Sequence, residues 1–323
     1  MGLFSNYPNG FGGGVTVRGV PILQTHPGQV FWVSNATTVL PGQKGGSNGN
    51  KGTFDAPFAT IAAAVSAATA NRGDIIMVKP GHAETVSAAS GITLSKAGVA
   101  IVGLGYGTMR PTITLDTANT ATIAVTAANV SLQNILIVGN FLSIATVFAL
   151  TTAKHFTLDN VEFRDNSSSL GFLSLVTTNS TTNAADGLSI TNCQWNGLST
   201  SATSAVLMAG TNTRITISNN RFVMAVNNNK AAIMAQSTGK VVTDLIMDSN
   251  TVYRLNTDTS SGGILITTDA TTNSGLVMNN RIRHADVAAA ILVTAGCLYG
   301  MVNNLATGDA DTSGFVLPAI GVD

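Results

Sequence analysis

The chain has 323 residues and is poor in charge: charged residues make up 10%, and 16 basic residues balance 16 acidic ones. Hydrophobic residues make up 45%, which excludes an intrinsically disordered chain. The neutral balance argues against nucleic acid as a partner, because nucleic acid needs a basic face. A charge-poor surface favours association, so we expect an oligomer.

The chain begins with an uncharged segment, residues 1–17, which holds five glycines and three aromatic residues. Such a segment is unable to make a core alone, and exposed aromatic rings usually need cover. We expect an arm that becomes ordered on a partner, with a frayed tail as the alternative. The start has no basic and apolar regions of a signal peptide, and no apolar run is long enough to span a membrane. The expected contact residues of the arm are Phe4, Tyr7, Pro8, Phe11 and Arg18.

Residues 30–33 are apolar and predict a strand, and the glycine-rich residues 41–53 predict a flexible linker. We therefore assign residues 1–53 to an attachment region and residues 54–323 to a second domain. Within residues 57–70 the apolar positions share one face, which predicts an amphipathic helix. This helix is expected to cover the open end of the domain that follows. Further strands are predicted at 91–94, 98–102, 112–115 and 121–126.

A phrase of alternating apolar residues followed by asparagine recurs between residues 130 and 305. Its asparagine position returns after 26, 32, 27, 30, 30 and 24 residues, a spacing typical of stacked repeats. Alternation with period two is typical of a strand with one buried face. Asparagine tolerates the left-handed backbone conformation, so a turn is expected there. The position is occupied by Asn134, Asn160, Asn192, Asn219, Ser249, Asn279 and Asn303.

Aligning the copies produces three apolar columns that we expect to be buried. A copy of this length has room for three short strands and three bends, and stacking at roughly 4.8 Å per copy would make each column continuous. We therefore predict an all-β fold, a right-handed parallel β-helix in which one copy makes one coil. The columns are Val130, Phe156, Leu188, Ile215 and Leu245; Leu132, Leu158, Ile190, Ile217 and Met247; and Ile137, Phe163, Trp195, Phe222 and Val252.

Two stretches resemble known proteins. DAPFATIAAAVSAATANRGDIIMVKPGHAETV, followed by GITLSKAGVAIVGLG, resembles the beginning of pectate-lyase-like right-handed β-helix proteins. SNYPNGFGGGVTVRGVPILQTHPGQVFWVSN is similar to the start of β-helix proteins encoded near the capsid genes of tailed bacteriophages. The second resemblance implies a trimeric decoration, cement or head-fibre protein on the capsid surface of a virion. It implies that the arm contacts the major capsid protein and that the chain is made in the host cytoplasm.

The sequence offers little acidic chemistry for an enzyme of this fold. Glycoside hydrolysis needs two carboxyl groups roughly 5–9.5 Å apart. Asp159 and Asp248 are expected three coils apart, roughly 14 Å. Glu162 and Asp165 are close in one coil and are interpreted as a solvated edge. The stacked acids that the lyase resemblance implies for calcium are not found, so we expect no catalytic residues and no enzyme.

No metal or cofactor site is expected either. Residues 309–314 imitate the start of an EF-hand loop, but the closing position holds Ile320 instead of glutamate. The four histidines are scattered along the chain. Cys193 and Cys297 are expected about four coils apart, too far for a disulfide, so we expect buried thiols.

Three functions are compatible with these features. The first is a structural phage virion protein, a capsid decoration or cement protein that attaches through its N-terminal region and projects a trimeric β-helix. Its trimer interface is expected at Leu136, Phe141, Leu142 and Phe148. The alternative is a tailspike-like protein that binds or degrades polysaccharide, with cell-surface glycans as partners and with Asp159, Glu162 and Asp165 tested first. An aromatic content of 6%, assigned mostly inward, counts against the alternative. A bacterial adhesin or another scaffold is the third possibility.

Overall fold

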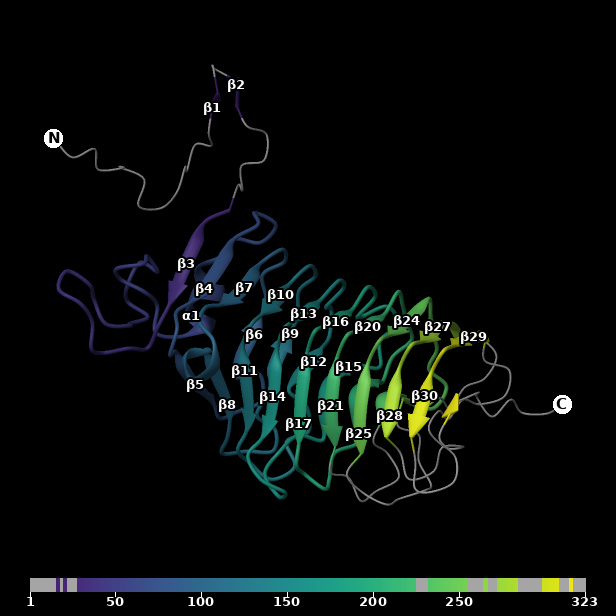
Figure 1. The fold of residues 1–323 in the computed structure, drawn as a ribbon. Coiled ribbons are helices and arrows are strands. Elements are labelled where there is room, and N and C mark those ends of the chain that lie inside the picture. Colours follow the sequence, from purple (N-terminus) through teal and green to yellow (C-terminus); the bar gives the residue numbers. More distant parts are fainter. Residues whose placement is uncertain are drawn as a thin grey trace.

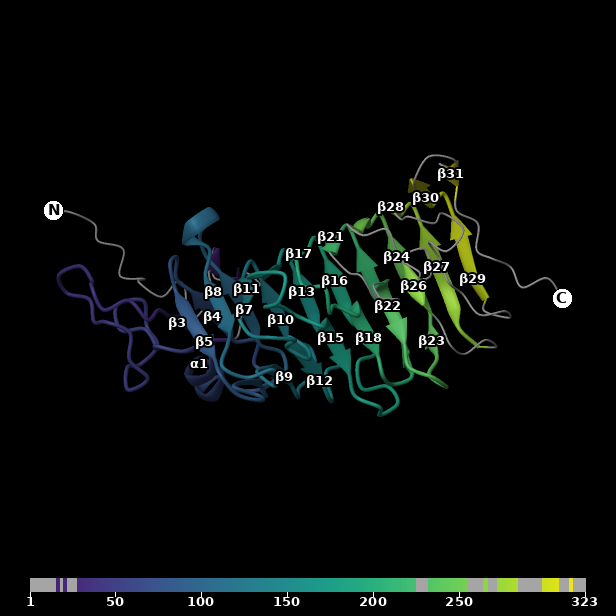
Figure 2. The same cartoon turned by 90° about the horizontal axis from the view of Figure 1, so that it is seen from below.

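In the computed structural model the chain forms an elongated right-handed parallel β-helix (Figure 1), which confirms the predicted fold class. Strands from successive coils pair side by side along the long axis, as Figure 2 shows from a second direction. The structure describes residues 16–17, 20–21, 28–224, 232–254, 264–266, 272–283, 298–307 and 314–315.

Three long sheets form the faces of the β-helix, and we call them sheets 1, 2 and 3. Among the described residues, sheets 1 and 2 have 10 strands each and sheet 3 has 7. Sheet 1 contains β3 (Val30–Val33), β4 (Ile75–Val78), β7 (Ala100–Gly103), β10 (Ser131–Gln133), β13 (Thr157–Asp159), β16 (Ser189–Thr191), β20 (Thr216–Ser218), β24 (Leu245–Asp248), β27 (Ser274–Met278) and β29 (Leu298–Val302).

Sheet 2 contains β5 (Ala83–Val86), β8 (Thr112–Leu115), β11 (Leu136–Gly139), β14 (Glu162–Asp165), β17 (Gln194–Gly197), β21 (Arg221–Met224), β25 (Thr251–Arg254), β28 (Arg281–Arg283), β30 (Leu305–Thr307) and β31 (Gly314–Phe315). Sheet 3 contains β6 (Ile92–Leu94), β9 (Ile123–Val125), β12 (Phe148–Leu150), β15 (Ser174–Thr178), β18 (Ser204–Met208), β22 (Ala232–Gln236) and β26 (Leu265–Ile266). Two short pairs stand apart: β1 (Thr16–Val17) with β2 (Val20–Pro21), and β19 (Asn212–Thr213) with β23 (Val242–Thr243).

The predicted apolar columns lie inside the β-helix. Phe163, Trp195 and Phe222 follow one another in the register of sheet 2, and each is at most 1% exposed. Leu132 and Leu158 pair in the same way in sheet 1. Burial of each large side chain contributes about 1.5–3 kcal/mol, so a continuous column is a principal source of stability. The registers predicted from the repeat are confirmed.

The repeated asparagine makes the bend between sheets 1 and 2. The backbone angle φ is positive at every copy, for example +55° at Asn134 and +51° at Asn160. This left-handed conformation turns the chain sharply after the sheet 1 strand, and asparagine adopts it more readily than most residues. The predicted turn is confirmed, including at Ser249, where φ is +56°.

A second asparagine ladder, not predicted from the sequence, lies one residue further along in the later coils. Its members are buried, and each Oδ1 after the first accepts two hydrogen bonds from the member one coil before. Asn250 Oδ1 accepts from Asn220 N at 3.1 Å and from Asn220 Nδ2 at 2.9 Å. Asn250 Nδ2 donates to Ile217 O at 2.8 Å. The ladder comprises Asn220, Asn250, Asn280 and Asn304.

A short helix covers the N-terminal end of the core, as predicted. Helix α1 (Ile61–Ala67) is shorter than the predicted 57–70, because it begins after Thr60, whose side chain accepts from Ala63 N. Its buried residues Ile61, Ala64 and Val65 face the core, and it packs against β3, β4 and β6. A single 3-10 turn, η1 (Gly107–Met109), lies in the loop between β7 and β8.

The β-helix begins at Val30, earlier than the predicted start at residue 54. Strand β3 pairs in parallel with β4, so it belongs to sheet 1. The loop between β3 and α1 is not a flexible linker, because hydrogen bonds fix it at several points. Asn50 Nδ2 donates to Gly45 O at 2.9 Å and to Pro57 O at 2.8 Å, and Trp32 N donates to Gly52 O at 2.7 Å.

Candidate functional site

The outer face of sheet 2 presents two columns of outward side chains, because alternate residues of each strand point away from the core. The strand registers align these side chains from coil to coil. The first column holds Leu136, Glu162, Gln194, Arg221, Thr251, Arg281 and Leu305. The second holds Val138, Arg164, Asn196, Val223, Tyr253 and Arg283.

The earlier part of this face is a closed ion-pair network around Glu162. Its Oε2 accepts from Arg110 Nη1 at 3.0 Å, and its Oε1 accepts from Arg164 Nη2 at 2.6 Å. Arg110 also donates to Asn134 Oδ1 and to Asn160 Oδ1, each at 3.0 Å. All three charges therefore have partners within the network, which ties the loop before β8 to the next two coils.

Asp165 is not part of a solvated edge, contrary to the interpretation of the sequence. It lies at the end of β14 on the inner side and is 1% exposed, whereas Glu162 and Arg164 face outward. Its carboxylate accepts from Phe172 N at 3.2 Å, Trp195 Nε1 at 3.3 Å and Ser199 N at 2.9 Å. Desolvation by burial raises the pKa of Asp165 to about 6, although these donors oppose the shift. Asp165 and Glu162 therefore do not form a catalytic pair.

The remaining candidate acids are also separated. Asp159 and Asp248 lie in register on sheet 1 and are three coils apart, as predicted. Asp159 accepts from Gln133 Nε2 at 3.0 Å and from Asn192 Nδ2 at 2.7 Å. The two acids are thus too far apart to act as the carboxyl pair that glycoside hydrolysis needs.

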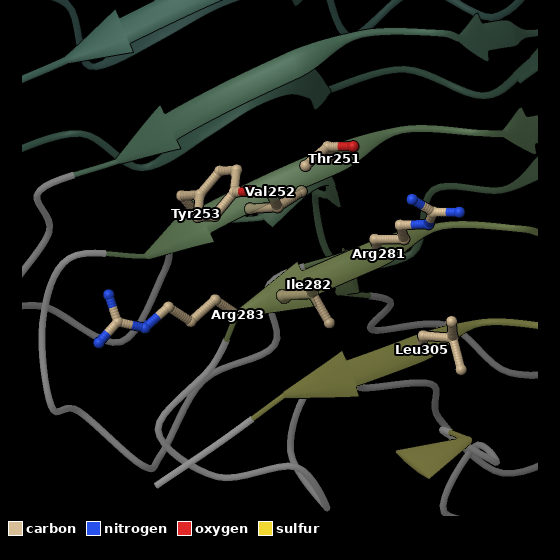
Figure 3. A pocket seen from close by; sticks show the side chains of 7 residues that line it. All are labelled: Thr251, Val252, Tyr253, Arg281, Ile282, Arg283 and Leu305. Carbon is tan, nitrogen blue, oxygen red and sulfur yellow. The ribbon is translucent and has the colours of Figure 1, made fainter. Parts of the chain in front are cut away.

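The later part of the outer face of sheet 2 contains a groove of about 380 Å³. Figure 3 shows Thr251 and Tyr253 on β25, Arg281 and Arg283 on β28, and Leu305 on β30. The two arginines project from the two ends of the short strand β28. Val252 and Ile282, which also line the groove, are buried in the core beneath it.

An aromatic and cationic surface surrounds this groove. The Tyr253 side chain is 41% exposed, and the guanidinium carbon of Arg221 lies 5.5 Å from the centre of its ring. Arg221, Arg281 and Arg283 are exposed, and within the part of the chain that the structure describes none has an ion-pair partner. The groove is not predicted from the sequence, because the aromatic residues are expected to point mostly inward. The alternation Thr251-Val252-Tyr253 around the buried Val252 is the signal that places Tyr253 outward.

The predicted interface residues have different environments. Phe148 is fully buried and faces the core, so its assignment to a trimer interface is wrong. Leu136 lies on the outer side of β11 but is only 9% exposed. Phe141 is partly buried against the core, whereas Leu142 is 57% exposed. Leu142 is therefore the one of the four that offers a large exposed apolar side chain.

The five residues predicted to contact a capsid, Phe4, Tyr7, Pro8, Phe11 and Arg18, lie outside the described residues. The EF-hand-like stretch from residue 309 to 313 and Cys297 also lie outside them.

Across the described ranges, no group of three or more His, Cys, Asp and Glu side chains has the arrangement of a metal site. His82 is buried and structural: Nδ1 accepts from Asn35 N at 3.2 Å, and Nε2 lies 3.2 Å from Glu84 Oε2. Burial likewise raises the pKa of the Cys193 thiol to about 12. No helix in the described part of the chain is long and apolar enough to cross a membrane.

Comparison with known proteins supports the fold. No protein-family model and no curated protein matches the chain. A pectin methylesterase in complex with a hexasaccharide is similar over 87% of this chain and 90% of its own, with a TM-score of 0.52 and 13% identity. Pectin methylesterase from Aspergillus niger in deglycosylated form is similar over 86% of this chain and 89% of its own, with a TM-score of 0.50 and 14% identity. A rhamnogalacturonan lyase is similar over 86% of this chain and 73% of its own, with a TM-score of 0.41 and 12% identity.

The two pectin methylesterase matches show the pectate-lyase-like fold that the first resemblance implies, and neither is a phage or capsid protein by name. The matches also contradict the prediction that the chain is not an enzyme. The pectin methylesterases share the β-helix over most of both chains, and they are enzymes. At these identities the likeness is one of fold, so the residues that act in those proteins are not transferred to this chain.

Proposed function

We propose that the chain is a carbohydrate-active β-helix protein that binds a polysaccharide on the outer face of sheet 2. The proposal rests on the groove of about 380 Å³ between β25, β28 and β30, because ligand sites are concave and combine apolar surface with a few placed polar groups. The similarity to pectin methylesterase, one structure of which is in complex with a hexasaccharide, supports it.

The chemistry of the groove suits a sugar ring. The partly exposed ring of Tyr253, with Arg221 over one face, provides an apolar surface with a polar hydroxyl at its tip, and Thr251 and the arginines provide hydrogen-bonding groups beside it. The outward columns continue from this groove along sheet 2, so an extended polymer has a surface of constant spacing to follow.

Binding of a panel of bacterial and plant polysaccharides, measured by calorimetry, tests this proposal. Replacing Tyr253 by alanine is expected to weaken binding about tenfold, because it removes the stacking surface. Tyr106→Ala is the matched control, because Tyr106 is 82% exposed in the loop between β7 and β8, away from the groove. Equal weakening in both variants, or no binding by the wild-type chain, would reject the proposal.

The same polysaccharides should be assayed for chain cleavage and for ester release. Glu162 is the outward acid in the first column, three coils from Thr251, so a polymer that follows the column passes it. If the protein degrades its ligand, Glu162→Gln is expected to abolish product formation while binding at Tyr253 persists. Products formed at the wild-type rate by this variant would remove Glu162 from the reaction.

The second candidate is the virion protein that the opening stretch implies. One observation favours it. The stretch that resembles the start of phage β-helix proteins leads directly into β3, the first strand of sheet 1. In this proposal the major capsid protein is the partner, a homotrimer forms on the capsid surface, and Leu142 contributes to the trimer interface. Deleting residues 1–17 should abolish capsid binding and leave the thermal transition unchanged, and native mass in solution should be that of a trimer.

A further inference from the structure

The charges on the outer face of sheet 2 are segregated along its length. Toward the N-terminal end, Arg110 and Arg164 both pair with Glu162, so each guanidinium there has an acidic partner although the network keeps one positive charge in excess. From β17 onward the outward residues of the two columns named above include no acid, but they include Arg221, Arg281 and Arg283. The chain as a whole has no net charge. Three positive charges nevertheless lie in or beside one groove, and none has an ion-pair partner among the described residues.

The three arginines have a regular spacing set by the strand register. Arg221 and Arg281 occupy the first column two coils apart, with Thr251 between them, which is roughly 10 Å along the axis. Arg283 lies in the second column, directly beside Tyr253. Since the cation–π contact with Tyr253 holds Arg221 over the ring, charge and aromatic surface are presented together.

We propose that the groove takes an anionic polysaccharide, which lies along the axis of the β-helix with its acidic groups on Arg221, Arg281 and Arg283. This inference rests on the proposed function and adds the charge class of the ligand. Guanidinium groups bind carboxylate, sulfate and phosphate oxygens through paired N–H donors, and these groups are the shared chemistry of the candidate ligands. A neutral polymer would leave Arg281 and Arg283 in the groove, and Arg221 beside it, without counter-charges.

The decisive experiment measures the affinity of the full chain for three soluble polymers at low and at physiological salt. Neutral dextran and dextran sulfate share a backbone and differ in charge, and alginate supplies carboxylates. Wild-type protein is expected to bind one or both anionic polymers, with affinity that falls as salt rises, and to bind dextran at least about tenfold more weakly. Preference between alginate and dextran sulfate identifies which acidic group the arginines select.

The test variant replaces Arg221, Arg281 and Arg283 by glutamine. Removing each charge-assisted hydrogen bond is expected to weaken anionic binding roughly tenfold. The control variant replaces Lys44, Lys51 and Lys154 by glutamine, which removes the same charge from exposed positions off this face. Unchanged melting temperatures establish that both variants fold.

The outcomes separate this inference from the proposed function. If dextran binds as well as the anionic polymers and binding depends on Tyr253, the function stands and the anionic ligand is rejected. If the lysine variant loses as much affinity as the arginine variant, binding follows net charge alone and the site is rejected. If neither anionic polymer binds the wild-type protein, the anionic ligand is rejected, and the proposed function is then decided by the polysaccharide panel and the Tyr253→Ala variant.

Discussion

The bend between sheets 1 and 2 is built in two ways along the same molecule. In the earlier coils the residue after the turn asparagine is apolar, Ile135 and then Val161, and it packs in the core. In the later coils the equivalent residue is a buried asparagine, as at Asn220 and Asn250, and it bonds from coil to coil. The comparison shows that one backbone geometry is stabilised by dispersion in one half and by hydrogen bonding in the other.

Cys193 marks the boundary between the two regions. Its backbone N–H donates to Asn220 Oδ1 at 2.8 Å, so it is joined to the first member of the ladder. Its Sγ lies 3.8 Å from Leu158 O. The equivalent contact one coil later is the hydrogen bond from Asn220 Nδ2 to Ile190 O at 2.9 Å. The thiol therefore occupies the place of an amide with weaker hydrogen bonds.

The largest expected effect comes from removing a ladder member. Asn250→Ala leaves two buried donor hydrogens of Asn220 without an acceptor and removes the amide that donates to Ile217 O. Unsatisfied buried groups cost about 1–3 kcal/mol each, so we expect a loss of roughly 3–5 kcal/mol in urea unfolding. Val161→Ala, the matched change in the apolar region, should cost about 2 kcal/mol through cavity formation. A smaller loss for Asn250→Ala than for Val161→Ala would contradict the comparison.

The next effect distinguishes a buried carboxylate from a buried amide. Because desolvation raises the pKa of Asp165 from its usual 3.8 to about 6, its contribution to stability is fully present below pH 3.8 and is lost as pH rises through 6. The loss amounts to about 3 kcal/mol. Asp165→Asn keeps an oxygen acceptor and does not titrate, so the wild-type chain should gain stability relative to this variant as pH falls from about 8 to about 4. Parallel thermal unfolding curves for both proteins across this range would show that Asp165 does not titrate as described.

A smaller effect is expected from extending the ladder by one coil. Cys193→Asn places an amide where the thiol now bonds weakly, so its Nδ2 should donate to Leu158 O. We expect a gain of about 1 kcal/mol in urea unfolding, the usual net value of one buried hydrogen bond. Cys193→Ala serves as the control, because it removes the thiol without adding an amide. Equal stability of the two variants would mean that the ladder ends at Asn220 for steric reasons.

The smallest effect concerns the reactivity of the boundary residue. The Cys193 thiol is buried and its pKa is raised to about 12 by desolvation, so the nucleophilic thiolate is scarce at neutral pH. In a Cys297→Ser background, a thiol reagent should label the denatured chain completely and leave the folded chain unlabelled at about pH 8. Rapid labelling of the folded protein would show that the bend at this coil opens.

The repeat makes much of the fold predictable. The stacking of Phe163, Trp195 and Phe222 follows from the alignment of the copies, because a column of large apolar residues is stable only when it faces the core. The turn at Asn134 follows from the backbone preference of asparagine. The Asn-Asn pairs at 219–220, 279–280 and 303–304 also signal the buried ladder, but one asparagine of each pair is sufficient to explain the turn.

The site is less predictable because it depends on which side chains lack partners. The sequence does not show that Arg110 neutralises Glu162 from 52 residues away. It also does not show that Arg221 and Arg281 have no ion-pair partner among the described residues. Phe148 lies outside the repeated phrase, where no neighbouring copy fixes its side of the strand, so its burial does not follow from the repeat. Glu162 and Asp165 are three residues apart in one strand, so alternation places their side chains on opposite faces of the sheet.

The buried ladder is directional, and this has a consequence for how the molecule is assembled. Each completed coil leaves a backbone N–H and a side-chain amide as donors, together with a strand carbonyl as acceptor, all facing the C-terminal side. The next coil supplies the single amide that satisfies all three. The N-terminal end is closed by α1, so the open, donor-bearing side of each coil faces the segment that the ribosome releases next. An unfinished polypeptide thus prepares the template for the segment still being synthesised.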